Sequence, residues 1–461
     1  MDSIKRRFFG RKMLLTEIVE GALAPQPADF ALIAPKFCGR SRIFDFLASD
    51  DGPLLGAQYS DMRPMRFRDG NRVVVALLDC NWPPAQANLL EFIASYLISR
   101  LRTSEGFPLD WQLITEQTSP ARQLWQLANQ LNSLDYRLIV LLNNFDSVLL
   151  EHRLSQDELN ELRPLTRELV LMIGTRQPLV DLDKTLAASP LFNVMTQLFV
   201  GLLEPRAAEE WIEAYCSRFP DIVPIKQRLL EATGQHPYLL TRVGDILTEI
   251  QRMKPGGQAP GTEDMALIEL RLAEHGRLLF ESMRQMLDSP PDRVAPHAVK
   301  GLVERLLDGF ISPANLSADE GIALNWLINQ AVVRYDSAGY RLFSLLFEQF
   351  LRAQPFQDAS ADSAVETHDN AVRTSLDEAA PHQLPRKEAD LLAYFQAHSN
   401  EVISAQQLLV DVWHLSADTS ERRVQEAIRR LRLYLRDGVE MGDIKNERGH
   451  GYRFVPSTRT S

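Results

Sequence analysis

The first 180 residues contain four short apolar runs, each separated from the next by segments of helical periodicity. The runs cover residues 30–33, 73–79, 138–142 and 169–173. Continuous apolar strands are typical of parallel sheets, because helices bury both faces of such a sheet. The alternation of these runs with helical segments such as residues 89–101 therefore predicts an α/β domain, which we assign to residues 1–200.

The middle of the chain is predicted to be helical. Apolar residues recur at spacings of three and four in segments 207–217, 226–233, 237–250 and 265–287. A helix at 322–330, a hairpin turning at Ser337-Ala338-Gly339 and a helix at 345–351 then give the outline of a small winged-helix unit. We assign residues 201–353 to a helical and winged-helix extension.

Residues 354–383 have a composition that does not favour a packed core. They contain six acidic residues against the single Arg373, with much Ala and Ser and almost no large apolar side chain. Such a composition predicts an acidic flexible linker. A compact segment with its own periodicity follows at residues 384–456 and is predicted to be a separate domain.

Overall composition sets limits on the type of protein. The 461 residues fit about three domains, and 50 Lys plus Arg against 61 Asp plus Glu give a net charge of −11, which argues against general polyanion binding by the whole molecule. Three scattered cysteines suit neither a disulfide framework nor a zinc site. No apolar stretch approaches the roughly 20 residues of a membrane span. We therefore expect a cytoplasmic protein with no metal centre and no membrane partner.

The last compact segment has the pattern of a DNA reader. Helices are predicted at 384–400, at 404–413 with Ser404 as N-cap, and at 420–435, where Val424, Ile428, Leu431 and Leu435 form a buried stripe. The opposite face and flanks of the third helix carry the basic side chains Arg422, Arg423, Arg429, Arg430 and Arg432. A hairpin with a basic tip follows, around Arg448-Gly449-His450-Gly451 and Tyr452. This surface suits phosphate contacts.

These motifs resemble the OmpR/PhoB-type winged-helix effector domain. The resemblance implies double-stranded DNA as partner, with the third helix in the major groove and the wing in the minor groove. It further implies that Arg422, Arg429 and Arg430 contact phosphates and bases, and that Arg448 and Tyr452 make the wing contacts. Ala427, Glu426 and Glu447 depart from the family pattern, so the resemblance does not transfer a target sequence.

A degenerate phosphate loop follows the first apolar run. A P-loop reads G-x4-G-K-[ST], because the glycines let backbone N–H groups surround the phosphates while the lysine and the hydroxyl serve phosphate and magnesium. The corresponding segment here is Ala34-Pro35-Lys36-Phe37-Cys38-Gly39-Arg40-Ser41. Asn143-Asn144 replaces the acidic pair expected after the third run, so hydrolysis is predicted to be very slow or absent.

The order of several weak motifs resembles a STAND or AAA+ type NTPase module. They are Phe9-Gly10-Arg11, Gly174-Thr175-Arg176, Leu203-Glu204-Pro205, the run 233–240 and Tyr340-Arg341-Leu342-Phe343. The resemblance implies that Thr175 and Arg176 lie at the sensor-1 position and that Pro237 packs near a nucleotide base. The candidate nucleotide-binding residues are Pro35, Lys36, Gly39, Arg40, Ser41, Asn143, Thr175 and Pro237. ATP or ADP with Mg²⁺ is the candidate cofactor.

Three alternatives remain open for this loop: a pocket that binds nothing, nucleotide binding without efficient turnover, and a working ATPase. The favoured interpretation of the whole chain is a DNA-binding transcriptional regulator with no catalytic residues. In it the degenerate module senses a ligand or protein partner, or forms a homo-oligomer. One alternative is a scaffold or assembly subunit of a mobile-element or defence system that binds DNA. Another is an active ATPase of STAND/AAA+ type.

Overall fold

The structure is a computed structural model. It describes residues 7–81, 88–103, 107–150, 156–182, 190–354, 356, 391–392, 394–395, 398–399, 401–412, 424, 428, 442–447 and 451–456. The chain divides into two compact units, Met1–Gln357 and Asp358–Ser461. The finer boundaries after residues 200, 353 and 383 stay predictions. Within the described residues, no helix is both long and apolar enough to cross a membrane.

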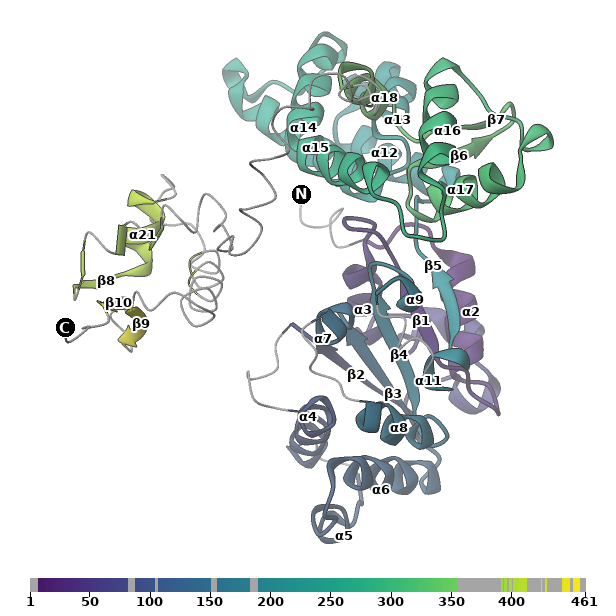
Figure 1. The fold of residues 1–461 in the computed structure, drawn as a ribbon, viewed down its shortest axis with the longest axis vertical. Helices are drawn as coiled ribbons and strands as arrows, with labels where there is room; N and C mark the ends of the chain where they lie inside the picture. The colour runs from purple at the N-terminus through teal and green to yellow at the C-terminus, as the bar shows by residue number, and fades with distance from the viewer. Residues whose placement is uncertain are drawn as a thin grey trace, which may run out of the picture. The chain divides into compact units, whose positions relative to one another are not determined.

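A five-stranded parallel sheet forms the centre of the first α/β region (Figure 1). Its strands are β1 (Phe30–Ile33), β2 (Val73–Asp79), β3 (Arg137–Asn143), β4 (Val170–Thr175) and β5 (Thr196–Phe199), in the spatial order β2-β3-β4-β1-β5. The four predicted strands are confirmed to within two residues at each end. β5 was not predicted, because only Leu198 of this edge strand is buried and the periodic apolar signal is absent.

Helices cover both faces of the sheet, as the apolar runs predicted. One face packs against α4 (Leu89–Thr103), α6 (Pro120–Ser133) and α8 (Gln156–Leu165). The other face packs against α2 (Lys12–Ala22) and α3 (Arg40–Ala48). Successive residues of β3 point to opposite cores, Leu138 and Val140 to the first and Ile139 and Leu141 to the second. The sheet is therefore buried on both sides.

The remainder of the first unit shares one apolar core. Its elements are α12 (Pro205–Arg218), α13 (Lys226–Thr233), α14 (Pro237–Met253), α15 (Met265–Asp288), α16 (Pro296–Asp308), α17 (Ala318–Asn329), β6 (Val333–Asp336), β7 (Gly339–Leu342) and α18 (Leu345–Ala353). The predicted helix, hairpin and helix correspond to α17, β6–β7 and α18, which confirms that outline. α17 begins four residues before the predicted start, because Ser317 and Glu320 form a capping box there.

The second unit has a small core beside a three-stranded antiparallel sheet. The sheet runs β8 (Val402–Ile403), β10 (Gly451–Pro456), β9 (Gly442–Glu447). Ser404 caps α21 (Ala405–Asp411), as predicted, by accepting a hydrogen bond from the backbone N–H of Gln407 at 3.1 Å. Val424 and Ile428 are helical and buried, as the predicted stripe required. Leu431 and Leu435 lie outside the described residues. The predicted fold class, an α/β domain of P-loop type with a C-terminal winged helix, is confirmed.

Candidate functional site

The loop between β1 and α3 has the local geometry of a phosphate loop. It leaves the sheet at Ala34, whose N–H donates to the carbonyl of Thr175 on the neighbouring strand at 3.0 Å. Gly39, at the N-cap of α3, has a φ of 89°. A side chain at this position would have open space around it, so backbone conformation is the reason for glycine here. The segment thus keeps the strand, loop and helix of a P-loop, although Ala34 stands in place of the first glycine and Arg40 in place of the lysine.

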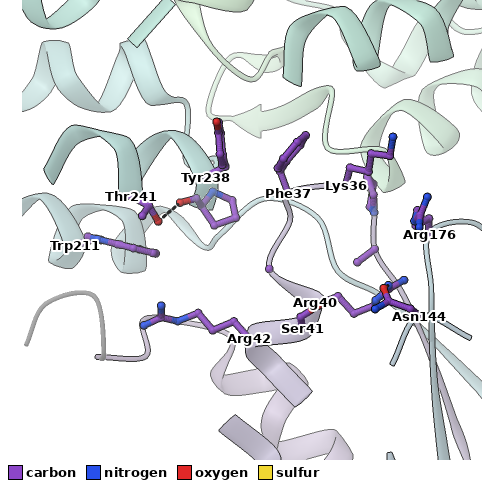
Figure 2. A pocket seen from close by; sticks show the side chains of 14 residues that line it. Lys36, Phe37, Arg40, Ser41, Arg42, Asn144, Arg176, Trp211, Tyr238 and Thr241 are labelled. Atoms are coloured by element: carbon purple, nitrogen blue, oxygen red, sulfur yellow. Dashed lines mark hydrogen bonds between the residues drawn. The ribbon is translucent and has the colours of Figure 1, made fainter. Parts of the chain in front are cut away.

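Arg40 turns inward, toward the carboxyl end of β3 (Figure 2). Its Nε donates to Oδ1 of Asn143 at 3.2 Å, and its Nη2 donates to Oδ1 of Asn144. Its Nη1 lies 3.6 Å from Oδ1 of Asp146, whose other oxygen pairs with Nε of Arg176 at 3.0 Å. Burial lowers the pKa of Arg40, while Asp146 opposes that shift. The guanidinium, which is charged in proteins at neutral pH, is held by β3 and the residues that follow it.

The two asparagines are held by further hydrogen bonds. Nδ2 of Asn143 donates to Oγ of Ser41 at 3.0 Å, and Nδ2 of Asn144 donates to Oδ1 of Asp79 at 2.8 Å. Each amide thus donates to one neighbour and accepts from Arg40. The loop, the end of β2 and the end of β3 are joined in one polar network that includes the hydroxyl predicted to serve a metal.

A cavity of about 470 Å³ opens above this network, between the loop and helices α12 and α14. Its lining comprises Ala34, Pro35, Lys36, Phe37, Gly39, Arg40, Ser41, Arg42, Asn144, Arg176, Trp211, Pro237, Tyr238 and Thr241 (Figure 2). The cations come from the loop, from α3 and from the end of the sheet, whereas Trp211 and Tyr238 come from helices α12 and α14 and Phe37 comes from the loop. None of these fourteen residues is acidic. The cavity is therefore suited to an anion with an attached flat or apolar group.

Six of the eight predicted nucleotide-binding residues line this cavity: Pro35, Lys36, Gly39, Arg40, Ser41 and Pro237. Asn143 lies behind Arg40, which it contacts, and Thr175 is fully buried with its hydroxyl donating to the carbonyl of Gln177 at 2.8 Å. Sequence reasoning missed Arg42, Trp211, Tyr238 and Thr241 as residues of the cavity wall. Trp211 is buried, yet it also forms part of the wall.

A second buried group lies next to the loop. Sγ of Cys38 is 3.9 Å from Nε2 of His236, and both side chains are buried. Burial raises the pKa of Cys38 to about 12, and burial together with the charge of Arg11 lowers the pKa of His236 to about 3. Because both groups are neutral near pH 7, the pair lacks the thiolate that a nucleophilic dyad requires. It is a packing contact between the loop and the helical part.

The depressed pKa of His236 predicts acid sensitivity. The unfolded chain takes up a proton near the ordinary pKa of 6.5, whereas the folded chain does so only near 3. Stability is therefore lost as pH falls through that window, by on the order of 3 kcal/mol at pH 4. We expect urea unfolding at pH 7 and pH 4 to show a smaller pH-dependent loss for His236→Gln than for the unsubstituted protein.

Asp29 also titrates in this pH range, but it does not affect the comparison of the two proteins. Burial raises its pKa to about 6, so its contribution to stability changes with pH in the opposite direction. Because Asp29 is present in both proteins, its effect cancels in the difference between them. Equal losses of unfolding free energy in the two proteins would contradict the assignment to His236.

The predicted DNA-binding residues lie in the second unit. Tyr452 is half-buried on β10, opposite Asn446 of β9 and Ile403 of β8. Arg422, Arg423, Arg429, Arg430, Arg432 and Arg448 lie outside the described residues. Their DNA contacts stay predictions, as does that of Tyr452.

Comparison with a protein-family model defines the class of the second unit. Residues 378–454 match the family described as "Transcriptional regulatory protein, C terminal". This match agrees with the core of Val424 and Ile428 and with the β8-β10-β9 sheet. The segment is an OmpR/PhoB-type winged-helix DNA-binding domain of transcriptional regulators, and it follows a P-loop-like α/β domain in the same chain.

Individual transcriptional regulatory proteins are also similar to part of this chain. The phosphate regulon transcriptional regulatory protein PhoB of Escherichia coli is 39% identical over 79 residues, which are 17% of this chain and 34% of that protein. PhoB of Klebsiella pneumoniae is 28% identical over 137 residues, 30% of this chain and 56% of that protein. The chain thus spans between a third and just over half of the length of these relatives.

Solved structures also resemble the chain. A Walker-type ATPase of Pyrococcus abyssi has 15% sequence identity and a TM-score of 0.43, covering 75% of this chain and 96% of that one. The ORC2 protein of Aeropyrum pernix in its ADP form has 12% identity and a TM-score of 0.41, covering 74% of this chain and 90% of that one.

Proposed function

We propose that this chain is a DNA-binding transcriptional regulator, in which the P-loop-like module acts as a sensor or oligomerisation unit without efficient ATP hydrolysis. The observation that carries the proposal is the match of residues 378–454 to a transcriptional-regulator domain. The described core and the three-stranded sheet of that domain support it. The N-terminal module contains a cationic cavity beside a phosphate-type loop, which supports a role for this module as the sensor.

The chemistry at the end of β3 supports the absence of efficient turnover. Hydrolysis needs a group that accepts a proton from the attacking water. Asn143 and Asn144 are amides, and the oxygen of each already accepts a hydrogen bond from Arg40. Asp146, the nearby carboxylate, faces both Arg40 and Arg176. An active ATPase would need this network to open, and ATP turnover that Ser41→Ala abolishes would favour that alternative.

DNA binding by the full-length chain tests the regulator proposal. A duplex selected from a random pool should bind, and Arg429→Ala or Arg430→Ala should each weaken binding by about tenfold or more, because each removes a charged contact. If the lost contact is to a phosphate, the slope of log K against the logarithm of the salt concentration should also fall in magnitude by about one. Fluorescence anisotropy at several salt concentrations measures both quantities.

Arg459→Ala serves as the control, because it removes the same charge outside the matched segment. Its affinity for the selected duplex should stay close to that of the unsubstituted chain. Recovery of no duplex from the pool would contradict the regulator proposal.

A further inference from the structure

The side chains between the phosphate loop and β3 do not fit a magnesium ion. Mg²⁺ requires oxygen ligands in near-octahedral geometry. Here Oγ of Ser41 accepts a hydrogen bond from Nδ2 of Asn143, and both asparagine oxygens accept from the guanidinium of Arg40. The oxygens that a metal would need are thus already engaged by N–H donors and by a fixed positive charge. The cation of this site is Arg40 itself.

Arg40 also presents its charge to the cavity. The residue is only 7% exposed, and it is one of the residues that line the cavity. Its Nη1 is buried and is paired with Oδ1 of Asp146 at 3.6 Å. Because the guanidinium is largely shielded from water, it attracts an anionic oxygen in the cavity more strongly than an exposed cation would.

The balance of charge around the cavity favours an anion. Asp146 is shared between Arg40 and Arg176, and Asp79 lies behind Asn144. Lys36 and Arg42 add further positive charge at the wall, where no carboxylate is present among the lining residues. The terminal groups of a polyphosphate are the anions that such a cluster of cations suits.

The helical wall offers a place for the rest of such a ligand. Pro237, Tyr238 and Trp211 line the side opposite Arg40 (Figure 2). The hydroxyl of Tyr238 donates to the carbonyl of His275 at 3.0 Å, and its ring lies 4.8 Å from that of Phe37. These contacts fix an aromatic surface that suits a nucleobase.

We propose that this cavity binds a nucleoside polyphosphate as the free anion, without a divalent metal, and that the guanidinium of Arg40 occupies the place of the metal. The inference rests on the nucleotide-sensing form of the proposed function and specifies the ligand of that site. Because magnesium neutralises part of the phosphate charge, excess magnesium competes with the protein for the ligand. The nucleotide site therefore differs from a P-loop that takes the magnesium complex.

Calorimetric titration of the full-length protein with ADP and with ATP tests this inference directly. Binding in EDTA should be at least as tight as in magnesium, and for ATP millimolar magnesium should weaken the apparent affinity by about tenfold. Tyr238→Ala should weaken binding of both nucleotides but leave binding of tripolyphosphate unchanged. Binding that requires magnesium, or no binding in either condition, would overturn the inference.

Arg40→Lys tests the role of the guanidinium while keeping the charge. An ammonium group cannot reproduce the contacts to Asn143 and Asn144, so ATP binding in EDTA should fall by about tenfold. Arg277→Lys is the matched control, since Arg277 is exposed on α15 and pairs with Glu281. Unchanged binding in Arg40→Lys would overturn the role given to Arg40.

Thermal unfolding of Arg40→Lys and Arg277→Lys verifies that both variants are folded. ATP titration of Arg176→Ala in EDTA is a second test of the same site. Arg176 lines the cavity and pairs with Asp146, so its loss should also weaken binding. The DNA-binding assay on the same preparations separates the two proposals. A protein that binds DNA but no nucleotide refutes this inference alone.

Discussion

Replacing Gly451 with alanine is expected to abolish DNA binding while leaving the unfolding of the first unit unchanged. Gly451 has a φ of 133°, and a Cβ atom there would lie 2.1 Å from the carbonyl oxygen of Ile403 and 2.7 Å from its carbonyl carbon. Both atoms belong to the backbone of β8, which pairs with β10 through Ile403 and Tyr452. The strand pairing must therefore shift, at a cost of about 3 kcal/mol or more.

Two measurements check this expectation. Fluorescence anisotropy with the selected duplex reports DNA binding, and scanning calorimetry reports the unfolding transitions of the full-length chain. Gln406→Ala, an exposed substitution on α21 in the same unit, is the control and should retain both properties. Normal DNA affinity in Gly451→Ala would show that the close approach of β10 to β8 is not needed for the active fold of this domain.

The parts of the fold that sequence could predict are those whose signal is local. β1 and β2 are continuous apolar runs, and their predicted bounds are correct to the residue. β5 has one buried residue in four, so its pairing with β1 depends on the rest of the sheet rather than on its own pattern. The early start of α17 follows from the reciprocal hydrogen bonds of Ser317 and Glu320, a local signal that the prediction did not use.

The candidate site shows the same division. The replacement of lysine by Arg40 and of the acidic pair by Asn143-Asn144 can be read directly from the motif. That both asparagines accept hydrogen bonds from Arg40 depends on the sheet order, which brings together residues more than 100 positions apart. Trp211 and Tyr238 reach the cavity through helices of another part of the unit, so periodicity alone indicated only their helical faces.

The second large effect is expected at Arg11, which joins the N-terminal segment, the phosphate loop and the helical part. Its Nη1 donates to the carbonyl of Leu202 at 2.8 Å, and its Nη2 donates to the carbonyls of Gly201 and Cys38. Its backbone N–H donates to Oε2 of Glu204 at 2.9 Å. The residue is only 8% exposed, and burial lowers its pKa. One side chain thus satisfies three carbonyl groups from two parts of the chain.

Arg11→Ala should lower the free energy of unfolding of the first unit by about 3 kcal/mol or more, because these carbonyls lose a charged donor. Arg11→Lys should recover only part of the loss, since a single ammonium does not reproduce the planar fork of a guanidinium. Urea unfolding followed by tryptophan fluorescence measures the change, and Trp211 is a suitable reporter because it stacks on Phe9, two residues before Arg11.

Lys12→Ala is the neighbouring control, because Lys12 is exposed and its removal changes the net charge by the same amount. It should change the unfolding free energy by less than about 0.5 kcal/mol. A loss for Arg11→Ala as small as that of the control would contradict a joining role for Arg11. If Arg11→Ala lost much of the unfolding free energy and Arg11→Lys lost none of it, charge rather than the three directed hydrogen bonds would hold the loop against the helical part.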